Sequence, residues 1–224
     1  MTTTTRIQIG SALLLATLAA CSTGPDTGVS VQLALCGGDD VCPGQEEQPP
    51  AEQPPQAPQV GCVLFMIRDV ELEAGDNKVV DERPWEPVDL LDPDASAINL
   101  EAPAGTYDRI KLKIEPLEGF ATGPTGRKVS TKVCATIDGV AIEYRDDTYD
   151  TFELRASAGI DVADGGLARL MAVFDTRAWF DGVDPSALEV GADGIAYIDE
   201  RNNKDWQNVV RDQIKDSVDL VRAE

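Results

Sequence analysis

Apolar and polar residues alternate along much of the chain, and a period of two is typical of β-strands with one buried face. In the clearest case Ile110, Leu112 and Ile114 point to one side, and the charged residues between them point to the other. Asp138-Gly139, between two further alternating runs, favours a tight hairpin turn. The predicted strands lie within residues 28–35, 62–72, 88–91, 105–114, 129–137, 140–144, 152–155, 167–174 and 194–198.

Two of these runs have no polar face. Residues 62–67 are apolar throughout, and residues 167–174 are apolar apart from Arg169, which is typical of interior strands covered on both sides. Many short strands separated by turns, without regularly alternating helices, indicate an all-β domain. We therefore predict an immunoglobulin- or transthyretin-like antiparallel β-sandwich over residues 28–200.

The tail follows a different period. Apolar residues recur there every three or four positions between charged ones, which is typical of an amphipathic helix, and Asn203 can cap its first turn. The apolar positions are Trp206, Val210, Ile214, Val218 and Val221. We predict a C-terminal amphipathic helix over residues 201–224 that docks on the sandwich, and a helix reserved for a partner is the alternative.

The first residues have the pattern of an export signal. Arg6 precedes an apolar run, residues 7–18, that is shorter than the roughly 20 residues of a membrane-spanning helix. The run closes on Leu18, Ala19, Ala20 and Cys21, which resembles the lipobox of bacterial lipoproteins, where the cysteine thiol carries the lipid. We expect residues 1–20 to be removed and Cys21 to be acylated. The alternatives are an ordinary signal peptide and an uncleaved helix.

Two further segments separate this anchor from the sandwich. Residues 21–27 are the expected lipidated tether, and the six residues after the cysteine reach about 20 Å. Residues 44–58 are rich in Pro and Gln, favour extended polyproline II and are predicted to be an insertion between the first two strands. Because Ser22, and not an inner-membrane-retaining Asp, follows the cysteine, we expect outer-membrane placement if the source has two membranes.

The composition excludes several classes of function. The 224 residues contain no His, so Ser-His-Asp and Cys-His catalysis and the usual His-bearing zinc sites are excluded. Asp and Glu number 40 against 19 Lys and Arg, which gives a net charge of −21. No nucleic-acid partner is expected, because phosphate backbones are bound by clustered cations.

Four cysteines remain once Cys21 is assigned to the lipid, and export favours disulfides. Cys36 and Cys42 flank a turn-rich loop and are predicted to pair, which leaves Cys62 and Cys134 to join two strands. A bond from Cys42 to Cys62 across the base of the insertion, or free buried thiols, are the alternatives. A metal–thiolate site is not expected because the chain has no C-x2-C pair.

A succession of short motifs resembles a known family. A tryptophan at position 85, VDLL at 88–91 and PAGTYDRIKL at 103–112 resemble an uncharacterised bacterial lipoprotein domain, the family called domain of unknown function 4382. The similarity covers residues 28 to about 175 and implies a β-sandwich with a lipid-anchored start and no catalytic motif. The proline-rich insertion, the cysteines and everything beyond Asp175 depart from the family, so the resemblance says nothing about the tail.

Three acidic clusters are candidate calcium sites, because Ca²⁺ takes clustered oxygen ligands. The segment with Asp92 and Asp94 lacks the Gly and the distal Glu of an EF-hand loop, and acids are so abundant that solvated loops are the expected role of the other two clusters. We therefore assign no metal and no cofactor, and no carboxylate pair can be singled out for glycoside hydrolysis. The clusters are Asp92 with Asp94, Asp146 with Asp147 and Asp150, and Asp181 with Asp184 and Asp193.

Basic and aromatic side chains offer two other candidate surfaces. Arg109, Lys111 and Lys113 line the solvent face of one predicted strand and are expected to pair with neighbouring acids, with a docking surface for an anionic polymer as the alternative. The tryptophans could stack on sugars, but their size favours burial. The three are Trp85, Trp179 and Trp206.

These observations predict an exported, lipid-anchored protein of the cell envelope that acts as a non-enzymatic binding or structural module. Its partners would be the membrane, through the lipid, and an envelope protein or a glycan. A calcium-stabilised adhesin module and a carboxylate-dependent hydrolase are the alternatives.

Overall fold

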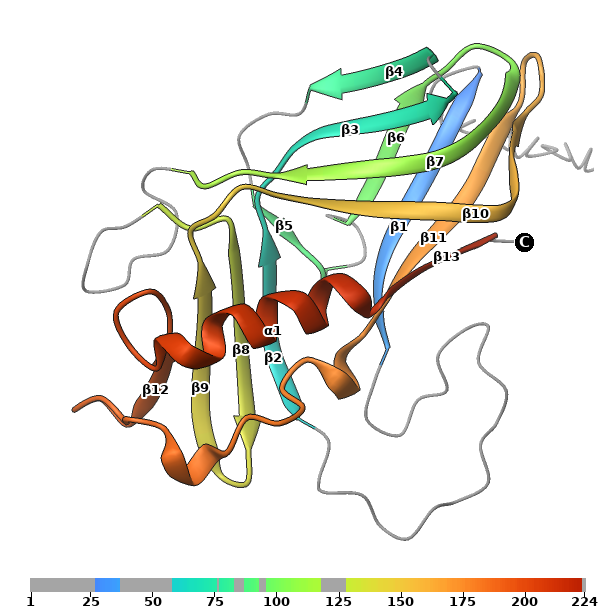
Figure 1. Ribbon diagram of the computed structural model, residues 1–224. Helices are drawn as coiled ribbons and strands as arrows, with labels where there is room; N and C mark the ends of the chain where they lie inside the picture. Colours follow the sequence, from blue (N-terminus) through green and yellow to red (C-terminus); the bar gives the residue numbers. More distant parts are fainter. Residues whose placement is uncertain are drawn as a thin grey trace, which may run out of the picture.

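The computed structural model describes residues 27–36, 58–75, 77–82, 87–92, 96–117 and 128–222. Most of these residues form β-strands, and helix α1 (Lys204–Asp216) lies across one group of them (Figure 1). Two short 3-10 turns, η1 (Thr176–Ala178) and η2 (Pro185–Ala187), precede the helix. The predicted all-β sandwich is confirmed.

The strands form three sheets. Sheet A has the order β13 (Val218–Arg222), β11 (Leu167–Asp175), β1 (Gly28–Cys36), β6 (Ala97–Glu101). Sheet B has the order β12 (Ile195–Ile198), β9 (Val140–Asp146), β8 (Thr131–Ile137), β2 (Gln59–Phe65), β5 (Val88–Asp89). Sheet C has the order β10 (Asp150–Val162), β7 (Gly105–Ile114), β3 (Ile67–Ala74), β4 (Asn77–Glu82).

Sheets A and C lie face to face as two layers, and sheet B continues from sheet C at one end (Figure 1). Strand β2 runs into β3 through Met66, and β9 runs into β10 through residues 147–149. Most neighbouring strands are antiparallel, but β1 pairs with β11 and β9 pairs with β12 in parallel. The sandwich is therefore mixed rather than purely antiparallel.

An aromatic cluster marks the place where the three sheets meet. Phe65 comes from sheet B, Phe152 from sheet C and Phe174 from sheet A. Their ring centroids are 5.3 to 5.7 Å apart, and two of the three pairs have edge-to-face geometry, an arrangement that aromatic rings favour. All three rings are buried, and one continuous hydrophobic core extends from them into every sheet.

The run 62–72 is one strand in the sequence prediction but two strands in the structure. Its chain changes sheets at Met66, whose N–H donates to the Ser130 carbonyl while its own carbonyl accepts from Glu115 N–H. A continuously apolar run does not show this break, because residues on both sides of it remain buried. Strands β4 and β6 were also missed, and β6 has only Ile98 and Leu100 as buried apolar positions.

The predicted C-terminal helix is confirmed over Lys204–Asp216, but the prediction that it extends to residue 224 is wrong at residues 218–222. Val218 and Val221 belong to β13, which pairs with β11 opposite Phe174 and Met171. The β-branched residues that continue the helical spacing also suit a strand, and the free edge of β11 provides hydrogen-bond partners.

Asn203 lies at the start of the helix, but its side chain makes no capping hydrogen bond. Its amide instead donates to the carbonyls of Glu189 and Tyr197, and its Oδ1 accepts from the Glu189 N–H. The residue therefore fixes the loop before the helix, and the capping prediction is wrong.

Two local predictions of the sequence hold in sheet B. Asp138 and Gly139 have φ angles of 49° and 82°, as a two-residue hairpin between β8 and β9 requires. The Cys62–Cys134 disulfide joins directly opposite residues of β2 and β8, which confirms that pairing and excludes the alternative bond from Cys42 to Cys62. Cys36 is a disulfide cysteine as well, and its predicted partner Cys42 lies outside the described residues.

Candidate functional site

The outer face of sheet C carries a charge ladder, which we define as Glu71, Glu73, Arg109, Lys111 and Lys113. The two acids lie on β3 and the three cations on the adjacent β7. Glu73 accepts from Arg109 Nε and, at 2.9 Å, from Lys111 Nζ. Glu71 accepts from Lys113 Nζ at 2.7 Å, and Lys78 on β4 adds a second contact at 3.1 Å. The basic stripe is thus paired with acids, as predicted.

The ladder lowers the pKa of both its acids and raises that of two of its bases, Arg109 and Lys113. The ammonium group of Lys113 is the largest cause of the lowered Glu71 pKa, and that of Lys111 is the largest cause for Glu73. The same hydrogen bonds raise the pKa of Arg109 and Lys113. These ion pairs favour the charged forms of Glu71, Glu73, Arg109 and Lys113 and lie across the outer face of sheet C.

A second ionic region, the helix latch, joins α1 to the end of β9. Arg211 donates to both oxygens of Asp146, from Nε at 2.6 Å and from Nη2 at 2.9 Å. Asp146 also accepts from Thr148 and, at 3.3 Å, from the Tyr144 hydroxyl. The Asp146 side chain is only 3% exposed. The hydrogen bonds with Asp146 raise the pKa of Arg211, and burial raises the pKa of Tyr144 well above its usual value.

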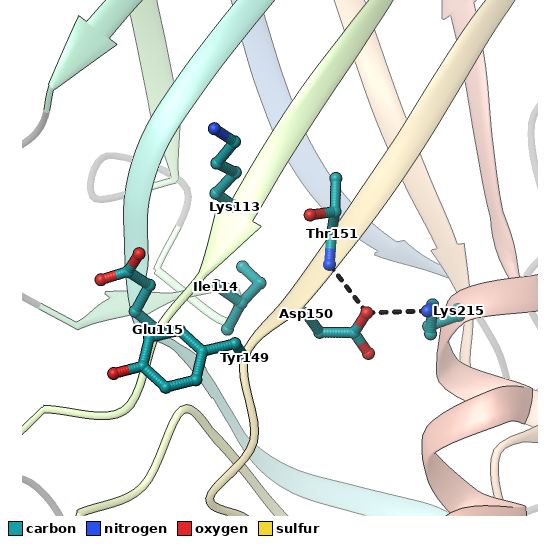
Figure 2. A pocket seen from close by; sticks show the side chains of 7 residues that line it. All are labelled: Lys113, Ile114, Glu115, Tyr149, Asp150, Thr151 and Lys215. Carbon is teal, nitrogen blue, oxygen red and sulfur yellow. Dashed lines mark hydrogen bonds and ion pairs between the residues drawn. The ribbon is translucent and has the colours of Figure 1, made fainter.

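An open groove of about 310 Å³ lies between the ladder and the latch (Figure 2). Lys113 and Glu115 border it from the end of β7, Tyr149, Asp150 and Thr151 from the start of β10, and Lys215 from α1. We call it the Tyr149 groove. Tyr149 is 74% exposed, which is the largest value among the exposed large hydrophobic residues of the described ranges.

The two lysines of the Tyr149 groove are already ion-paired. Lys215 Nζ lies 2.7 Å from Asp150 Oδ1, which also accepts from the Thr151 N–H (Figure 2). Lys113 is held by Glu71 of the ladder. By contrast, the Tyr149 hydroxyl, the Glu115 carboxylate and the Thr151 hydroxyl make no hydrogen bond or ion pair with the residues that the structure describes.

The backbone fixes these groups. Glu115 N–H donates to the Met66 carbonyl at the point where β2 passes into β3. Thr151 lies opposite Lys113 in the β7–β10 pairing, so both side chains project from the same face of sheet C. Tyr149 precedes β10 in the short segment that follows the latch residue Thr148. Figure 2 shows Tyr149 and Glu115 on the same side of the groove, opposite Lys215.

Four acids of the three clusters have structural roles. Asp146 and Asp150 bind Arg211 and Lys215, Asp184 caps η2 through Ser186, and Asp193 accepts from the Tyr197 hydroxyl at 2.6 Å. Within the described ranges no three Cys, Asp or Glu side chains gather in a way that could hold a metal ion. Asp94 lies outside these ranges.

Trp179 is fully buried and donates from Nε1 to Ser217 Oγ at 2.7 Å, while Trp206 is partly buried against the core. The burial prediction is confirmed for Trp179. Trp85 lies outside the described residues, as do Cys21, the lipobox residues 18–20, most of the tether and nearly all of the proline-rich insertion.

Sequence reasoning named Asp150 and Lys113 for other reasons and missed Tyr149, Glu115, Thr151 and Lys215 as groove residues. An aromatic residue between acids in a predicted loop was the only available signal, because the groove forms from segments far apart in the chain.

Comparisons with family models, with curated proteins and with solved structures find no match to this chain. Across the residues that can be described, no helix is both long and apolar enough to cross a membrane.

Proposed function

We propose that this chain is an exported, lipid-anchored protein of the cell envelope that binds a ligand without transforming it. The Tyr149 groove is the proposed binding place. The lipid on Cys21 would hold the sandwich at a membrane, because each buried methylene of an acyl chain contributes about 0.8 kcal/mol.

The observation that carries the non-enzymatic proposal is the direction in which carboxyl pKa values move. Each described carboxyl group with a displaced pKa has it lowered, namely Glu71, Glu73, Asp184 and Asp193. A carboxyl group that acts as a general acid near neutral pH needs a raised pKa. These acids are held as carboxylates by ion pairs and caps, which supports binding and structural roles.

The start of the sandwich supports the proposed anchoring. The Thr27 hydroxyl accepts from the Gly165 N–H at 2.9 Å, and its carbonyl accepts from the Ala102 N–H at 3.3 Å. The last residue of the proposed tether is thus fixed to two loops at one end of the sandwich. The Cys62–Cys134 disulfide suits the oxidising compartments that exported proteins reach.

Mass spectrometry of full-length protein made in a bacterium tests the anchoring. We expect the first peptide to begin at an acylated Cys21 and the protein to fractionate with membranes. The variant Cys21→Ala should lose the lipid and leave the membrane fraction. An unmodified Cys21 with residues 1–20 still attached would contradict the proposal.

A further inference from the structure

We propose that the Tyr149 groove binds an uncharged saccharide. This inference rests on the proposed function, because it names the ligand class of the binding module. It draws on the exposed ring, the unpaired polar groups beside it and the ion-paired charges around them.

The exposed ring provides a stacking platform. Tyr149 is 74% exposed although the other tyrosines of the chain are used internally: Tyr107 and Tyr144 are buried, and Tyr197 bonds Asp193. An exposed aromatic face is typical of binding surfaces, because ring contact gives large area at low conformational cost. The C–H face of a pyranose ring has the matching flat, weakly apolar surface.

The polar groups around the ring match sugar hydroxyls. A sugar hydroxyl can donate to the Glu115 carboxylate, and it can both donate to and accept from the Thr151 and Tyr149 hydroxyls. None of the three makes a hydrogen bond or close ion pair with the described residues, so a ligand would not have to break one to reach them, although the charge of Glu115 also acts on Lys113. Ligand sites typically combine an apolar surface, here the Tyr149 ring, with a few placed polar groups.

The charges around the groove select against ionic ligands of either sign. Each of its lysines lies 2.7 Å from a carboxylate oxygen, Lys113 from Glu71 and Lys215 from Asp150. An anion would have to displace one of these acids against the −21 net charge of the chain. A cation would gain the Glu115 carboxylate alone and would meet both ammonium groups in the same small space. A neutral, hydroxyl-rich ligand avoids both costs.

Calorimetric titration of detergent-extracted full-length protein tests the inference. The probes are uncharged hexasaccharides with different linkages: cellohexaose, maltohexaose and chitohexaose. We expect at least one of them to bind. Tyr149→Ala should weaken that binding about tenfold, because it removes the stacking contact. Thr151→Val should weaken it by about two- to tenfold, because the hydroxyl is lost. Glu115→Gln should weaken it by a smaller factor, because the amide oxygen still accepts a hydrogen bond but without the charge that strengthens it.

The matched control is Leu91→Ala, which removes an exposed apolar side chain, 48% exposed, that does not line the groove. Its affinity should equal that of the unchanged protein. Raising the salt from about 0.05 M to about 0.5 M should leave the affinity unchanged, because a neutral ligand has no ionic attraction to screen. Urea unfolding measures the stability of each variant, so that a loss of binding can be distinguished from a loss of folding.

Binding by none of the probes, equal affinity for Tyr149→Ala, or binding abolished by salt would overturn the saccharide inference. These results differ from failure of the proposed function. Lipidated protein that binds no sugar overturns only the inference. Sugar-binding protein with an unmodified Cys21 overturns only the anchoring, and a shortened saccharide in the titration cell would overturn the non-enzymatic proposal.

Discussion

The charge ladder on sheet C and the helix latch beneath α1 are both ionic, but they differ in what covers them. The ladder acids are covered by the stems of Lys and Arg side chains on a solvent-facing sheet, with Lys113 itself 35% exposed. The latch carboxylate of Asp146 is 3% exposed and accepts hydrogen bonds from both Nε and Nη2 of Arg211. The carboxylates of both regions are nearly buried, since the Glu71 side chain is 5% exposed, but its two lysines reach water further than Arg211 does: they are 54% and 35% exposed against 21%.

This difference assigns the two regions different physical roles. Ion pairs on a solvent-facing surface contribute little each, whereas removing one partner of a buried pair leaves an uncompensated charge. The ladder keeps the outer face of sheet C charged and soluble, and the latch holds the helix on sheet B. The Tyr149 groove lies where the two regions meet, with Lys113 from the ladder and Lys215 from α1, the helix that the latch holds.

The largest predicted effect is at the latch. Asp146→Ala should lower the free energy of unfolding by about 3 kcal/mol, because it leaves the Arg211 guanidinium and the Tyr144 hydroxyl without their shared partner. Urea unfolding followed by circular dichroism measures this. A loss below about 1 kcal/mol would mean that the latch contributes no more to stability than an ion pair of the ladder.

A smaller effect is predicted for the ladder. Glu71→Gln should cost about 1 kcal/mol, because two lysines lose their carboxylate while water still solvates them. Glu153→Gln is the matched control on the neighbouring strand, since its side chain is 36% exposed. It should change stability by less than about 0.5 kcal/mol. Equal effects at both positions would remove the special role of Glu71.

The ladder also predicts a dependence of stability on pH. The pKa values of Glu71 and Glu73 are lowered below the ordinary 4.5 by their cationic partners. Their carboxylates therefore take up protons when the protein unfolds at acidic pH. Their contribution is complete above about pH 4.5 and is lost as the pH falls through the lower folded values. Unfolding free energies between about pH 6 and pH 3 should fall less steeply in the double variant Glu71→Gln/Glu73→Gln. Parallel curves would contradict this.

The last prediction concerns the stability of the latch at alkaline pH. Burial raises the pKa of Tyr144 above the ordinary 10.0, so its phenol stays neutral in the folded protein and its stabilisation is lost as the pH rises beyond the unfolded value. Absorbance titration should show one tyrosine that ionises only with unfolding, and Tyr144→Phe should abolish that phase. Its persistence in the variant would assign it to another residue.

The sequence pattern predicted most of the sandwich because most strands have one buried face. The alternation of Ile110, Leu112 and Ile114 and the Asp138-Gly139 turn are local features, and both are confirmed. Local patterns could not show that the chain changes sheets at Met66, because both neighbouring segments are buried. They also could not show that Val218 leaves the helix, since that depends on the free edge of β11.

The candidate site was less predictable than the fold. The pairing of Lys113 with an acid follows from cross-strand neighbours and was expected. The Tyr149 groove requires the end of β7, the start of β10 and the last turn of α1 to come together, and no local spacing encodes that contact. Only the structure distinguishes Tyr149, which faces solvent, from Tyr144, which the latch buries.

The most direct test of the account is a fluorine NMR titration of the full-length protein with fluorotyrosine at its four tyrosine positions. Each resonance can be assigned by a single Tyr→Phe variant, and the probe is the saccharide that binds in calorimetry. The account predicts that the Tyr149 resonance shifts progressively while those of Tyr107, Tyr144 and Tyr197 stay in place. A saccharide that leaves Tyr149 unmoved and shifts another tyrosine would contradict it.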